Sequence, residues 1–591
     1  MTRKEDGGVI ERKGGTWTRA GAAGVQLLAL GLMSFLLGGG QSSAQAGLSP
    51  LRQSSSLAAA TDAPIAPAVA CGTLAPIGTA AQPGVPDFTA IPGAPTRVTS
   101  ATVTAAGAQS PEFCDVKGYI APQVHFELKL PTKTWQGRYL QSGCGGFCGA
   151  VGSPSFPSCD LQPGGDFAVA ATDDGHAAGG TDGLWGVNDQ QLRVDFAAGA
   201  LHALAVAAKA IIQAFYGVGP RFSYFQGCSD GGREALIEAQ RFPDDFNGIV
   251  AGAPANIWAP LLAESLAWNA RANMDAQGSQ ILTADKLPAL HDAVLKACDG
   301  KDGLVDGQID DPRACSFDPA SLTCPTATDQ PTCLTPAQVT TARKLYEGPV
   351  DSAGRHLYPG GEPFGSELAW VPWVVTPPGV QSLDSGFSDS YLRYLGFPIG
   401  QPASSLQDWQ FTVSGFNRLR AAGQLYNATD ADLSAFRRRG GKLIIWHGWA
   451  DPAIAPDGTP AYYQAVQDRM GGLQAVQKFA RLFMVPTVYH CGGTYGTGAA
   501  VRFDFVNAIT HWVELGAAPE RIVVTHVDQA GNIVRTRPVF AYPQQARYTG
   551  TGSIDDAASF VAVTPSPLPD DHVKWVGNNL FGAGGDDRSN E

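Results

Sequence analysis

The chain has 591 residues, too many for one compact core, so two domains or one core with a large insertion are expected. Hydrophobic residues make up 44% and charged residues 16% of the sequence, a balance that fits a folded globular protein and excludes wholesale disorder. The 41 basic and 54 acidic side chains give a net charge of −13 without any basic run, which argues against nucleic acid or an anionic membrane surface as a partner.

The amino terminus has the pattern of a secretory signal. Basic residues at positions 12–19 precede an apolar run at 25–37, and Ala-Gln-Ala at 44–46 supplies a small-x-small cleavage pattern. The run is shorter than the roughly 20 residues needed to span a bilayer. Residues 1–46 are therefore predicted to be a signal peptide, which implies a secreted or periplasmic protein with no membrane contact after cleavage. Residues 47–70, rich in Ala, Ser and Pro, are predicted to be a flexible leader.

All eleven cysteines follow the predicted signal peptide, so most of them are expected to be paired in an oxidising compartment. Because eleven is odd, at least one thiol is free or bonds another molecule. Cys71 and Cys114 bracket a segment of turns and short apolar runs and could staple it to the core.

The first core region, residues 71–255, alternates between predicted strands and helices. Residues 123–130 alternate between apolar and polar side chains, which predicts a strand with one buried face. Further strands are predicted at 138–141, 167–172, 224–225 and 248–251, and helices at 197–215 and 233–241. This alternation predicts an α/β fold with a mostly parallel, doubly wound sheet.

Residues 256–428, here called the lid segment, differ in character. They are rich in Pro, Gly and Trp and lack repeated strand–helix units, whereas strand patterns return at 439–446 and 482–485. The lid segment is therefore predicted to be an insertion between two strands of one sheet, with residues 429–591 completing the core. No period of 20–50 residues recurs, which excludes a repeat protein.

A Gly-x-Ser-x-Gly pattern at 227–231 places Ser229 between a β-prone run and a helix. This is the strand–turn–helix context of a nucleophile elbow, in which glycines allow a sharp turn close to its neighbours. A serine nucleophile needs a base, and the base needs an orienting carboxylate. Two loops at strand ends further along the chain supply candidates, Asp451 and His490, in the serine–acid–histidine order of α/β hydrolases.

Competing histidines have weaker settings. His447 precedes the candidate acid and is expected to orient its loop, and His176, which comes before Ser229, could line the pocket. The other seven of the ten histidines lack a comparable position.

The glycine-rich segment 142–149, here called the oxyanion loop, follows an early strand. In an α/β hydrolase such a loop donates one backbone N–H to the oxyanion hole, and the residue after the serine donates the other. From composition alone, a flexible surface loop remains an alternative.

Two cysteines flank the candidate nucleophile and base. Cys228 immediately precedes Ser229, and Cys491 immediately follows His490. A disulfide between them would hold the two groups together, the alternative being two unrelated buried cysteines.

An acidic loop at 298–311 carries five aspartates punctuated by glycines, and these carboxylates would repel one another without a cation. Hard oxygen ligands at such spacing suit Ca²⁺, although the spacing is not that of an EF-hand. A solvated acidic turn is the alternative from composition.

The motifs Gly-Cys-Ser-Asp-Gly-Gly-Arg-Glu at 227–234, His-Gly-x-x-Asp at 447–451 and His-Cys-Gly-Gly at 490–493 resemble the tannase/feruloyl esterase family. The resemblance runs from roughly residue 71 to residue 553 and implies an α/β-hydrolase fold with an inserted lid. It also implies a catalytic triad of Ser229, Asp451 and His490. A disulfide would join Cys228 to Cys491, and the amides of Gly146 and Asp230 would form the oxyanion hole.

The resemblance implies a structural Ca²⁺ ion in the lid segment. Its ligands would be the side chains of Asp299, Asp302 and Asp306 and the backbone carbonyls of Leu304 and Gln308. Disulfides would close this loop and a neighbouring one, Cys298 with Cys315 and Cys324 with Cys333. Two features depart from the family: no cysteine follows Cys491, and the oxyanion loop carries Cys144 and Cys148, with Cys159 close by. The pairing among these three cysteines stays open.

The resulting prediction is a secreted serine esterase acting on small esters of aromatic acids. Hydroxycinnamate esters are the first choice of substrate, gallate esters the second and mono(2-hydroxyethyl) terephthalate the third. The third is ranked last because the family also includes a bacterial mono(2-hydroxyethyl) terephthalate hydrolase, which has an aromatic residue where this chain has Ile454. The lid segment supplies aromatic side chains that could bind a flat acyl group or form the lid core: Trp370, Trp373, Tyr391, Tyr394, Phe397, Trp409, Phe411 and Phe416.

A different class, a non-catalytic secreted binding protein on a hydrolase scaffold, is the remaining alternative. An intact triad argues against it, since a binding module need not retain all three groups. The sequence does not determine the oligomeric state.

Overall fold

The computed structural model describes residues 63–75, 87–157, 167–326 and 328–582, all within the compact unit Arg52–Glu591. The predicted signal peptide, most of the predicted leader and Cys159 lie outside the described residues.

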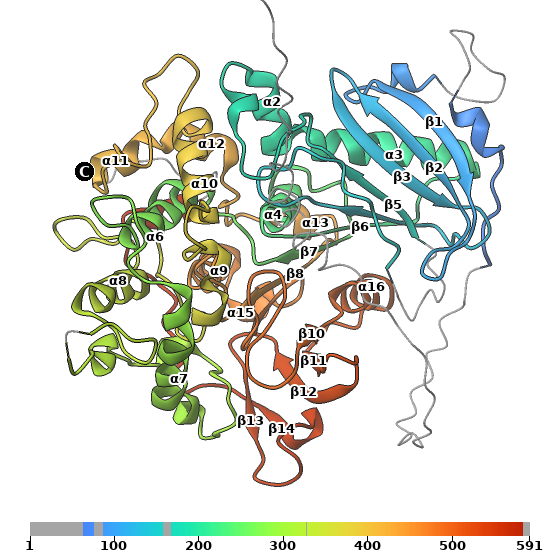
Figure 1. Cartoon of the computed structure of the whole chain (residues 1–591). Helices are drawn as coiled ribbons and strands as arrows, with labels where there is room; N and C mark the ends of the chain where they lie inside the picture. Colours follow the sequence, from blue (N-terminus) through green and yellow to red (C-terminus); the bar gives the residue numbers. More distant parts are fainter. Residues whose placement is uncertain (1–62, 76–86, 158–166, 327, 583–591) are drawn as a thin grey trace, which may run out of the picture. The chain divides into compact units, whose positions relative to one another are not determined.

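A nine-stranded sheet runs through the described part of the chain in the order β1-β2-β3-β5-β4-β6-β7-β8-β9 (Figure 1). The six strands from β5 to β9 in this order are parallel, while β1, β2 and β3 pair antiparallel with one another and with β5. The predicted mostly parallel α/β sheet is confirmed. The strands are β1 Thr96–Thr104, β2 Phe113–Ile120, β3 Val124–Pro131, β4 Arg138–Ser142, β5 Phe167–Thr172, β6 Phe222–Cys228, β7 Gly248–Gly252, β8 Lys442–Gly448 and β9 Ala480–Val485.

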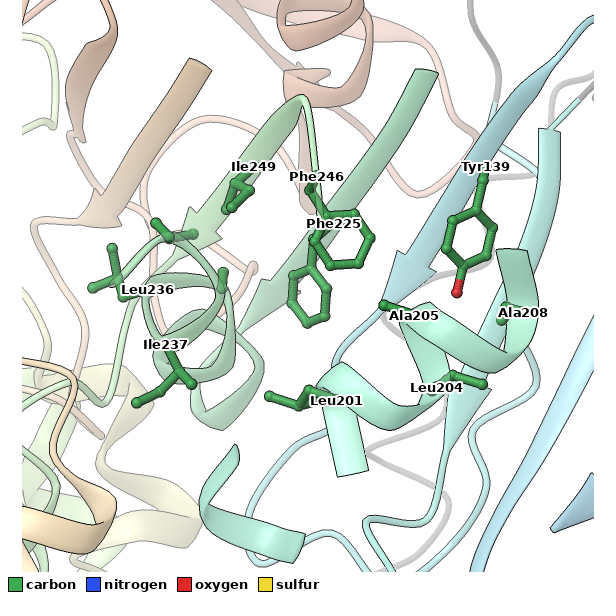
Figure 2. Packing of buried hydrophobic residues seen from close by; sticks show 14 of the residues in the cluster. Tyr139, Leu201, Leu204, Ala205, Ala208, Phe225, Leu236, Ile237, Phe246 and Ile249 are labelled. Carbon is green, nitrogen blue, oxygen red and sulfur yellow. The ribbon is translucent and has the colours of Figure 1, made fainter. Parts of the chain in front are cut away.

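Helices cover both faces of this sheet because successive strand residues point to opposite sides. On one face, Phe225 of β6 packs with α3 (Ala200–Tyr216) and α4 (Asp230–Arg241), as Figure 2 shows. On the other face, Tyr224 packs in a cluster with Phe505 and Ile509 of α16 (Phe505–Leu515). Helices on both faces are the hallmark of a doubly wound fold.

The helical run Gln190–Tyr216 combines α2 (Gln190–Val194), a π-helical turn (Asp195–Gly199) and α3. Its length and apolar composition would suffice to cross a membrane, but 67% of its most apolar window is buried inside the protein. Leu201 and Leu204 of α3 pack beneath the sheet in Figure 2. In this structure the run is therefore a core helix of the α/β fold.

Strands β7 and β8 pair in parallel register although residues 253–441 separate them along the chain. This agrees with an insertion between two strands of one sheet. The helices of the lid segment are α5 Trp258–Pro260, α6 Leu266–Ala272, α7 Leu287–Cys298, α8 Pro336–Glu347, α9 Trp370–Trp373, α10 Leu383–Ser390, α11 Val413–Arg418 and α12 Arg420–Tyr426.

Several elements have no counterpart in the sequence prediction. The antiparallel strands β1 and β2 extend the sheet. Strand β1 lies where only turns and short apolar runs were expected, and β2 lies in the following segment, for which no strand was predicted. One short helix precedes β8, and two small antiparallel sheets and further helices follow it. These elements are α13 Ser434–Arg438, α14 Gly458–Met470, α15 Leu473–Val476, β10 Ala500–Arg502, β11 Arg521–Val527, β12 Ile533–Phe540, β13 Gln545–Tyr548 and β14 Phe560–Val563.

Five disulfides join ten of the described cysteines. Four have the partners expected from the sequence and the family resemblance, and the fifth pairs two of the three cysteines whose pairing was open. The pairs are Cys71–Cys114, Cys228–Cys491, Cys298–Cys315, Cys324–Cys333 and, within the oxyanion loop, Cys144–Cys148.

Candidate active site

Backbone strain is concentrated in the loops that follow the parallel strands. A non-glycine residue with positive φ is uncommon, and such residues cluster at functional sites. Every residue of this kind in the described chain lies in a loop after β4, β5, β6, β7 or β9, which marks one edge of the sheet as the candidate site. They are Cys148, Asp174, Ser229, Ala253, Thr487 and Cys491.

Ser229 lies at the turn between β6 and α4, with φ 67° and ψ −122°. Its amide donates a hydrogen bond to the Gly252 carbonyl (3.0 Å), which ties the turn to the neighbouring strand. A Cβ at Gly227 would lie only 2.3 Å from the Gly231 carbonyl oxygen, so a side chain cannot be accommodated there. The turn therefore has the geometry of a nucleophile elbow, which presents the serine at the end of the sheet.

Asp451 is fully buried in the loop after β8 and contacts two histidines. Its Oδ2 lies 2.8 Å from Nδ1 of His490 and 3.1 Å from Nε2 of His447. Its Oδ1 accepts hydrogen bonds from the amides of Ala453 (2.8 Å) and Ile454 (3.0 Å). Burial alone would raise the pKa of Asp451, but the combined attraction of His490 and His447 outweighs it, so the pKa lies below its ordinary value.

His490 lies in the loop after β9, where its side chain retains 12% of its exposure. The Cys228–Cys491 disulfide brings the α-carbons of the residues flanking Ser229 and His490 to 5.8 Å from each other. Because consecutive α-carbons are about 3.8 Å apart, the α-carbons of Ser229 and His490 are at most about 13 Å apart. The disulfide therefore keeps the two residues within a range that includes contact between their side chains.

The oxyanion loop is held in place by hydrogen bonds on both sides of its centre. The amide of Phe147 donates to the Gly180 carbonyl (2.7 Å), and the Phe147 carbonyl lies 2.7 Å from Nε2 of His176. His176 is thus buried behind the loop. On the other side of the loop centre, the Cys144 carbonyl accepts a hydrogen bond from the Gly231 amide (2.9 Å). Between Cys144 and Phe147, Gly146 has φ +63°, and its amide has no acceptor among the described residues. An unpaired N–H at this place is available to a ligand.

Asp230 is the first residue of α4, where backbone amides lack intrahelical acceptors. Its carboxylate is fully buried and pairs with Arg233, whose guanidinium also donates to the carbonyls of Phe196 and Ala197 (both 3.0 Å). Burial raises the pKa of Asp230, while the Arg233 charge opposes that rise. The helix terminus that carries the Asp230 amide is therefore fixed by a buried ion pair.

Behind the oxyanion loop lies a group of two sulfur atoms and three carboxyl groups, here called the sulfur–carboxyl cluster. Its members are Cys144, Cys148, Asp174, Asp230 and Glu234, and their ligand-type atoms lie within 4.8 Å of one another. Groups of this composition could hold a metal ion, although here the two sulfurs are joined in a disulfide. Burial, followed by the Asp230 charge, raises the pKa of Glu234 to about 7, and burial raises that of Asp174 well above its ordinary value.

Aromatic rings connect the oxyanion loop to His490. Phe147 packs edge-on against Phe387 (5.2 Å between centroids), Phe387 lies beside Trp373 (6.2 Å), and Trp373 packs edge-on against His490 (5.2 Å). Of the lid aromatics that could bind a flat acyl group or form the lid core, only Trp373 joins this row. The others pack against other apolar residues; those that are buried are Trp370, Tyr391, Phe397, Trp409 and Phe416, and those that are half-buried are Tyr394 and Phe411.

Sequence reasoning missed Phe147, Phe387 and Glu234 as parts of this region. Phe147 lies inside the glycine-rich segment and Glu234 inside the Gly-Gly-Arg-Glu motif, so both had a sequence signal. Phe387 stands on a lid helix far from any motif and had none.

The acidic loop of the lid segment has its own network of hydrogen bonds. The Asp299 carboxylate accepts hydrogen bonds from the amides of Asp306 (3.1 Å) and Gly307 (2.9 Å), and Asp302 accepts one from Leu304 (2.8 Å). The loop is therefore folded around its own carboxylates.

The donor set of the acidic loop fits a hard cation. Asp306 Oδ1 is buried without a partner among the described residues, although Oδ2 of the same group pairs with Arg537. Burial and the neighbouring Asp310 raise the pKa of Asp302 to about 7. Crowded carboxyl groups of this kind are stabilised when a cation replaces their protons.

Comparisons with known proteins identify the family of this chain. Residues 105–563 match the family model described as "Tannase and feruloyl esterase". An uncharacterized esterase of Xanthomonas campestris pv. campestris is 35% identical, over 83% of this chain and 94% of that protein. The mono(2-hydroxyethyl) terephthalate hydrolase of Piscinibacter sakaiensis is 34% identical, over 79% of this chain and 87% of that protein.

Among solved structures, feruloyl esterase B from Aspergillus oryzae superposes with a TM-score of 0.67 at 29% identity, covering 79% of this chain and 97% of that one. This likeness extends the match from sequence motifs to the whole α/β architecture. The named relatives are esterases, which excludes the binding-protein alternative as the main function. The chain is therefore a carboxylic ester hydrolase and belongs to the tannase and feruloyl esterase family.

Proposed function

We propose that this enzyme is a secreted serine esterase that cleaves small esters of aromatic acids through a Ser229–His490–Asp451 triad. The observation that carries the proposal is the Cys228–Cys491 disulfide, which couples the strained elbow at Ser229 to the loop that carries His490. The 2.8 Å contact between His490 and the buried Asp451 supports the same assignment. The five disulfides fit an oxidising compartment and thus secretion or a periplasmic location.

The proposed reaction proceeds through an acyl-enzyme. His490 removes the hydroxyl proton of Ser229 as Oγ attacks the ester carbonyl carbon. The negative charge on the carbonyl oxygen is stabilised by the amides of Gly146 and Asp230. Asp451 accepts the Nδ1 proton of His490 in a hydrogen bond, so that Nε2 faces the serine.

When the tetrahedral intermediate collapses, His490 returns its proton to the leaving alcohol and the acyl group stays on Ser229. A water molecule then attacks the acyl carbon, with His490 again acting as the base. Release of the carboxylic acid regenerates the free serine.

The substrate class follows from the row of rings between Gly146 and His490. Of these rings, only Trp373 is partly exposed, and it packs edge-on against His490, so its flat apolar surface suits an aromatic acyl group. The buried Phe387 packs against Trp373, and the buried Phe147 packs against Phe387. Hydroxycinnamate esters remain the first choice because the superposed structure is a feruloyl esterase. Gallate esters and mono(2-hydroxyethyl) terephthalate remain second and third.

We also propose a structural Ca²⁺ ion in the acidic loop, held by Asp299, Asp302 and Asp306 and by the carbonyls of Leu304 and Gln308. The unpartnered Oδ1 of Asp306 and the crowding around Asp302 support it. The ion would neutralise the loop and stabilise the lid segment without taking part in the reaction.

A substrate panel with a matched serine variant tests the esterase assignment. We expect kcat/KM to be highest for methyl ferulate, lower for methyl gallate and lowest for mono(2-hydroxyethyl) terephthalate. Ser229→Ala should reduce kcat for every active ester at least about 10⁴-fold. Ser223→Ala, a buried serine on the same strand, should retain activity. Near-normal turnover by Ser229→Ala would contradict the mechanism, and a reversed panel order would contradict the substrate class.

A further inference from the structure

The Cys144–Cys148 disulfide encloses the residue whose amide is proposed to bind the oxyanion. Only residues 145–147 stand between the two cysteines, whose α-carbons are 5.5 Å apart. Gly146, the middle residue, presents an N–H group that has no acceptor among the described residues. The disulfide therefore constrains the backbone on both sides of an unpaired donor.

The backbone at Cys148 also requires support. Its φ of +57° is unusual for a residue with a side chain, and such a conformation persists only where the surroundings impose it. Two local contacts do so, the disulfide itself and a hydrogen bond from the Cys148 amide to the Gly145 carbonyl (3.1 Å). Without the disulfide, only hydrogen bonds would hold this strained residue: its own to Gly145 and those of its neighbours, from the Phe147 amide to Gly180 and from the Gly149 amide to Asp173 (3.3 Å).

The disulfide also contacts the residue that supplies the second proposed donor. The Asp230 carboxylate lies 3.4 Å from the sulfur of Cys148 and 3.6 Å from that of Cys144. In addition, the Cys144 carbonyl accepts a hydrogen bond from the Gly231 amide (2.9 Å). The bridge thus lies between the loop that carries the Gly146 amide and the helix terminus that carries the Asp230 amide.

We propose that Cys144 and Cys148 are positioning residues whose disulfide sets the separation of the two oxyanion-hole amides. This inference rests on the proposed function, because it assigns a role within the same site. Donors that are fixed before the reaction stabilise a developing charge without reorganising. Hydrogen bonds of Phe147 hold one side of this glycine-rich loop, and the disulfide adds a covalent constraint across the residue that carries the donor.

The surroundings of the sulfurs favour the oxidised pair as the working form. Three buried carboxyl groups adjoin them, with Glu234 Oε1 3.0 Å from Cys144 and Asp174 Oδ2 3.4 Å from Cys148. A thiolate here would be destabilised by burial and by repulsion from whichever of these carboxyl groups is ionised. A disulfide carries no charge and no titratable proton, so it fits this environment.

The test is the Cys144→Ala/Cys148→Ala variant, assayed with p-nitrophenyl acetate. This ester has a small acetyl group, so its turnover does not depend on the row of aromatic rings. We expect kcat to fall tenfold to a hundredfold while KM changes less than about threefold, because the loss concerns the transition state. The affinity of a boronic acid that adds to the active-site serine should fall by a similar factor. A variant that only loses stability would not show this split.

Cys324→Ala/Cys333→Ala removes another local disulfide, in the lid segment, and should leave kcat unchanged. If the alanine pair does not fold, Cys144→Ser/Cys148→Ser replaces it, because its hydroxyls can donate to the adjacent carboxylates. Wild-type kcat in either folded variant, or an equal loss in the lid variant, overturns the inference. Turnover that survives Ser229→Ala overturns the proposed function as well, whereas Ser229-dependent turnover that survives loss of the bridge overturns this inference alone.

Discussion

The two disulfides at the candidate site have similar α-carbon separations, 5.8 Å for Cys228–Cys491 and 5.5 Å for Cys144–Cys148, but they act on different scales. The first joins residues 263 positions apart, and the second residues four positions apart. The long-range bridge joins the loops of the two proposed catalytic groups, Ser229 and His490, whereas the local bridge closes one loop. Bringing two side chains together and fixing one backbone donor are separate requirements. This site meets each of them with a disulfide of its own.

Removing the long-range bridge should have the largest effect. In Cys228→Ala/Cys491→Ala we expect kcat for p-nitrophenyl acetate to fall at least about 100-fold, because even a 1 Å displacement of a catalytic group can cost that much. The free energy of unfolding should fall by about 2–5 kcal/mol, the usual cost of losing a native disulfide. Steady-state kinetics and urea unfolding measure the two effects.

Cys71→Ala/Cys114→Ala is the control, since that bridge joins η1 (Cys71–Leu74) to β2 rather than the catalytic loops. It should lose stability but keep kcat. A folded Cys228→Ala/Cys491→Ala variant with kcat within threefold of wild type would show that hydrogen bonds alone hold the two catalytic groups, and the contrast between the bridges would disappear.

Glu234 lies next to the local bridge, and its Oε2 accepts a hydrogen bond from the Cys144 amide (3.1 Å). Because its folded pKa of about 7 exceeds the ordinary 4.5, the folded protein binds this proton more tightly than the unfolded chain. Stability should therefore rise as the pH falls from 8 to 5, by on the order of 3 kcal/mol from this group. Glu234→Gln keeps an acceptor, lacks the titration and should flatten that dependence in urea unfolding.

Glu520→Gln, a largely exposed carboxyl group paired with Arg481, is the matched control and should leave the pH dependence unchanged. An identical pH dependence in Glu234→Gln and wild type would mean that this carboxyl titrates normally and that the cluster under the bridge is more open to water than the structure indicates.

A third bridge, Cys298–Cys315, is also local and closes the acidic loop, which is proposed to bind Ca²⁺. We expect a chelator to lower the melting temperature by a few degrees while leaving kcat for p-nitrophenyl acetate nearly unchanged, because the ion binds only the folded loop. Differential scanning calorimetry with and without added Ca²⁺ measures the shift.

In Asp302→Asn, the chelator should have a smaller effect than in wild type, because a proposed ligand is weakened. Equal shifts in the two proteins would assign the effect to another site, and no shift in wild type would indicate that the disulfide alone holds the loop.

Much of the core could be predicted from the sequence because its signals are local. The apolar run at 167–172 is β5, and the Gly-x-Ser-x-Gly pattern lies at the turn between β6 and α4. The contact between His490 and Asp451 could be expected because the carboxyl ends of parallel strands meet at one edge of a sheet. His447, expected to orient the loop of the acid, indeed contacts it.

What could not be predicted depends on contacts between distant segments. The place of Phe387 beside Phe147 is decided by how the lid segment packs, and no periodicity encodes it. Trp409 and Trp370 looked equally suited to a substrate, but the interior of the lid segment buries them. The strand β1 was missed because its pairing with β2, rather than a strong apolar alternation, determines it.

The pairing of β7 with β8 also sets the order in which this protein can assemble. Residues 253–441 leave the ribosome between the two strands, and β9 and the loop of His490 emerge later still. Non-local strand pairing is slow, and domains fold largely in order of synthesis. The proposed nucleophile is therefore made early and its proposed base late, so an unfinished chain that ends before β9 holds Ser229 without His490. On the proposed mechanism, hydrolysis can begin only after the last strand of the sheet has docked.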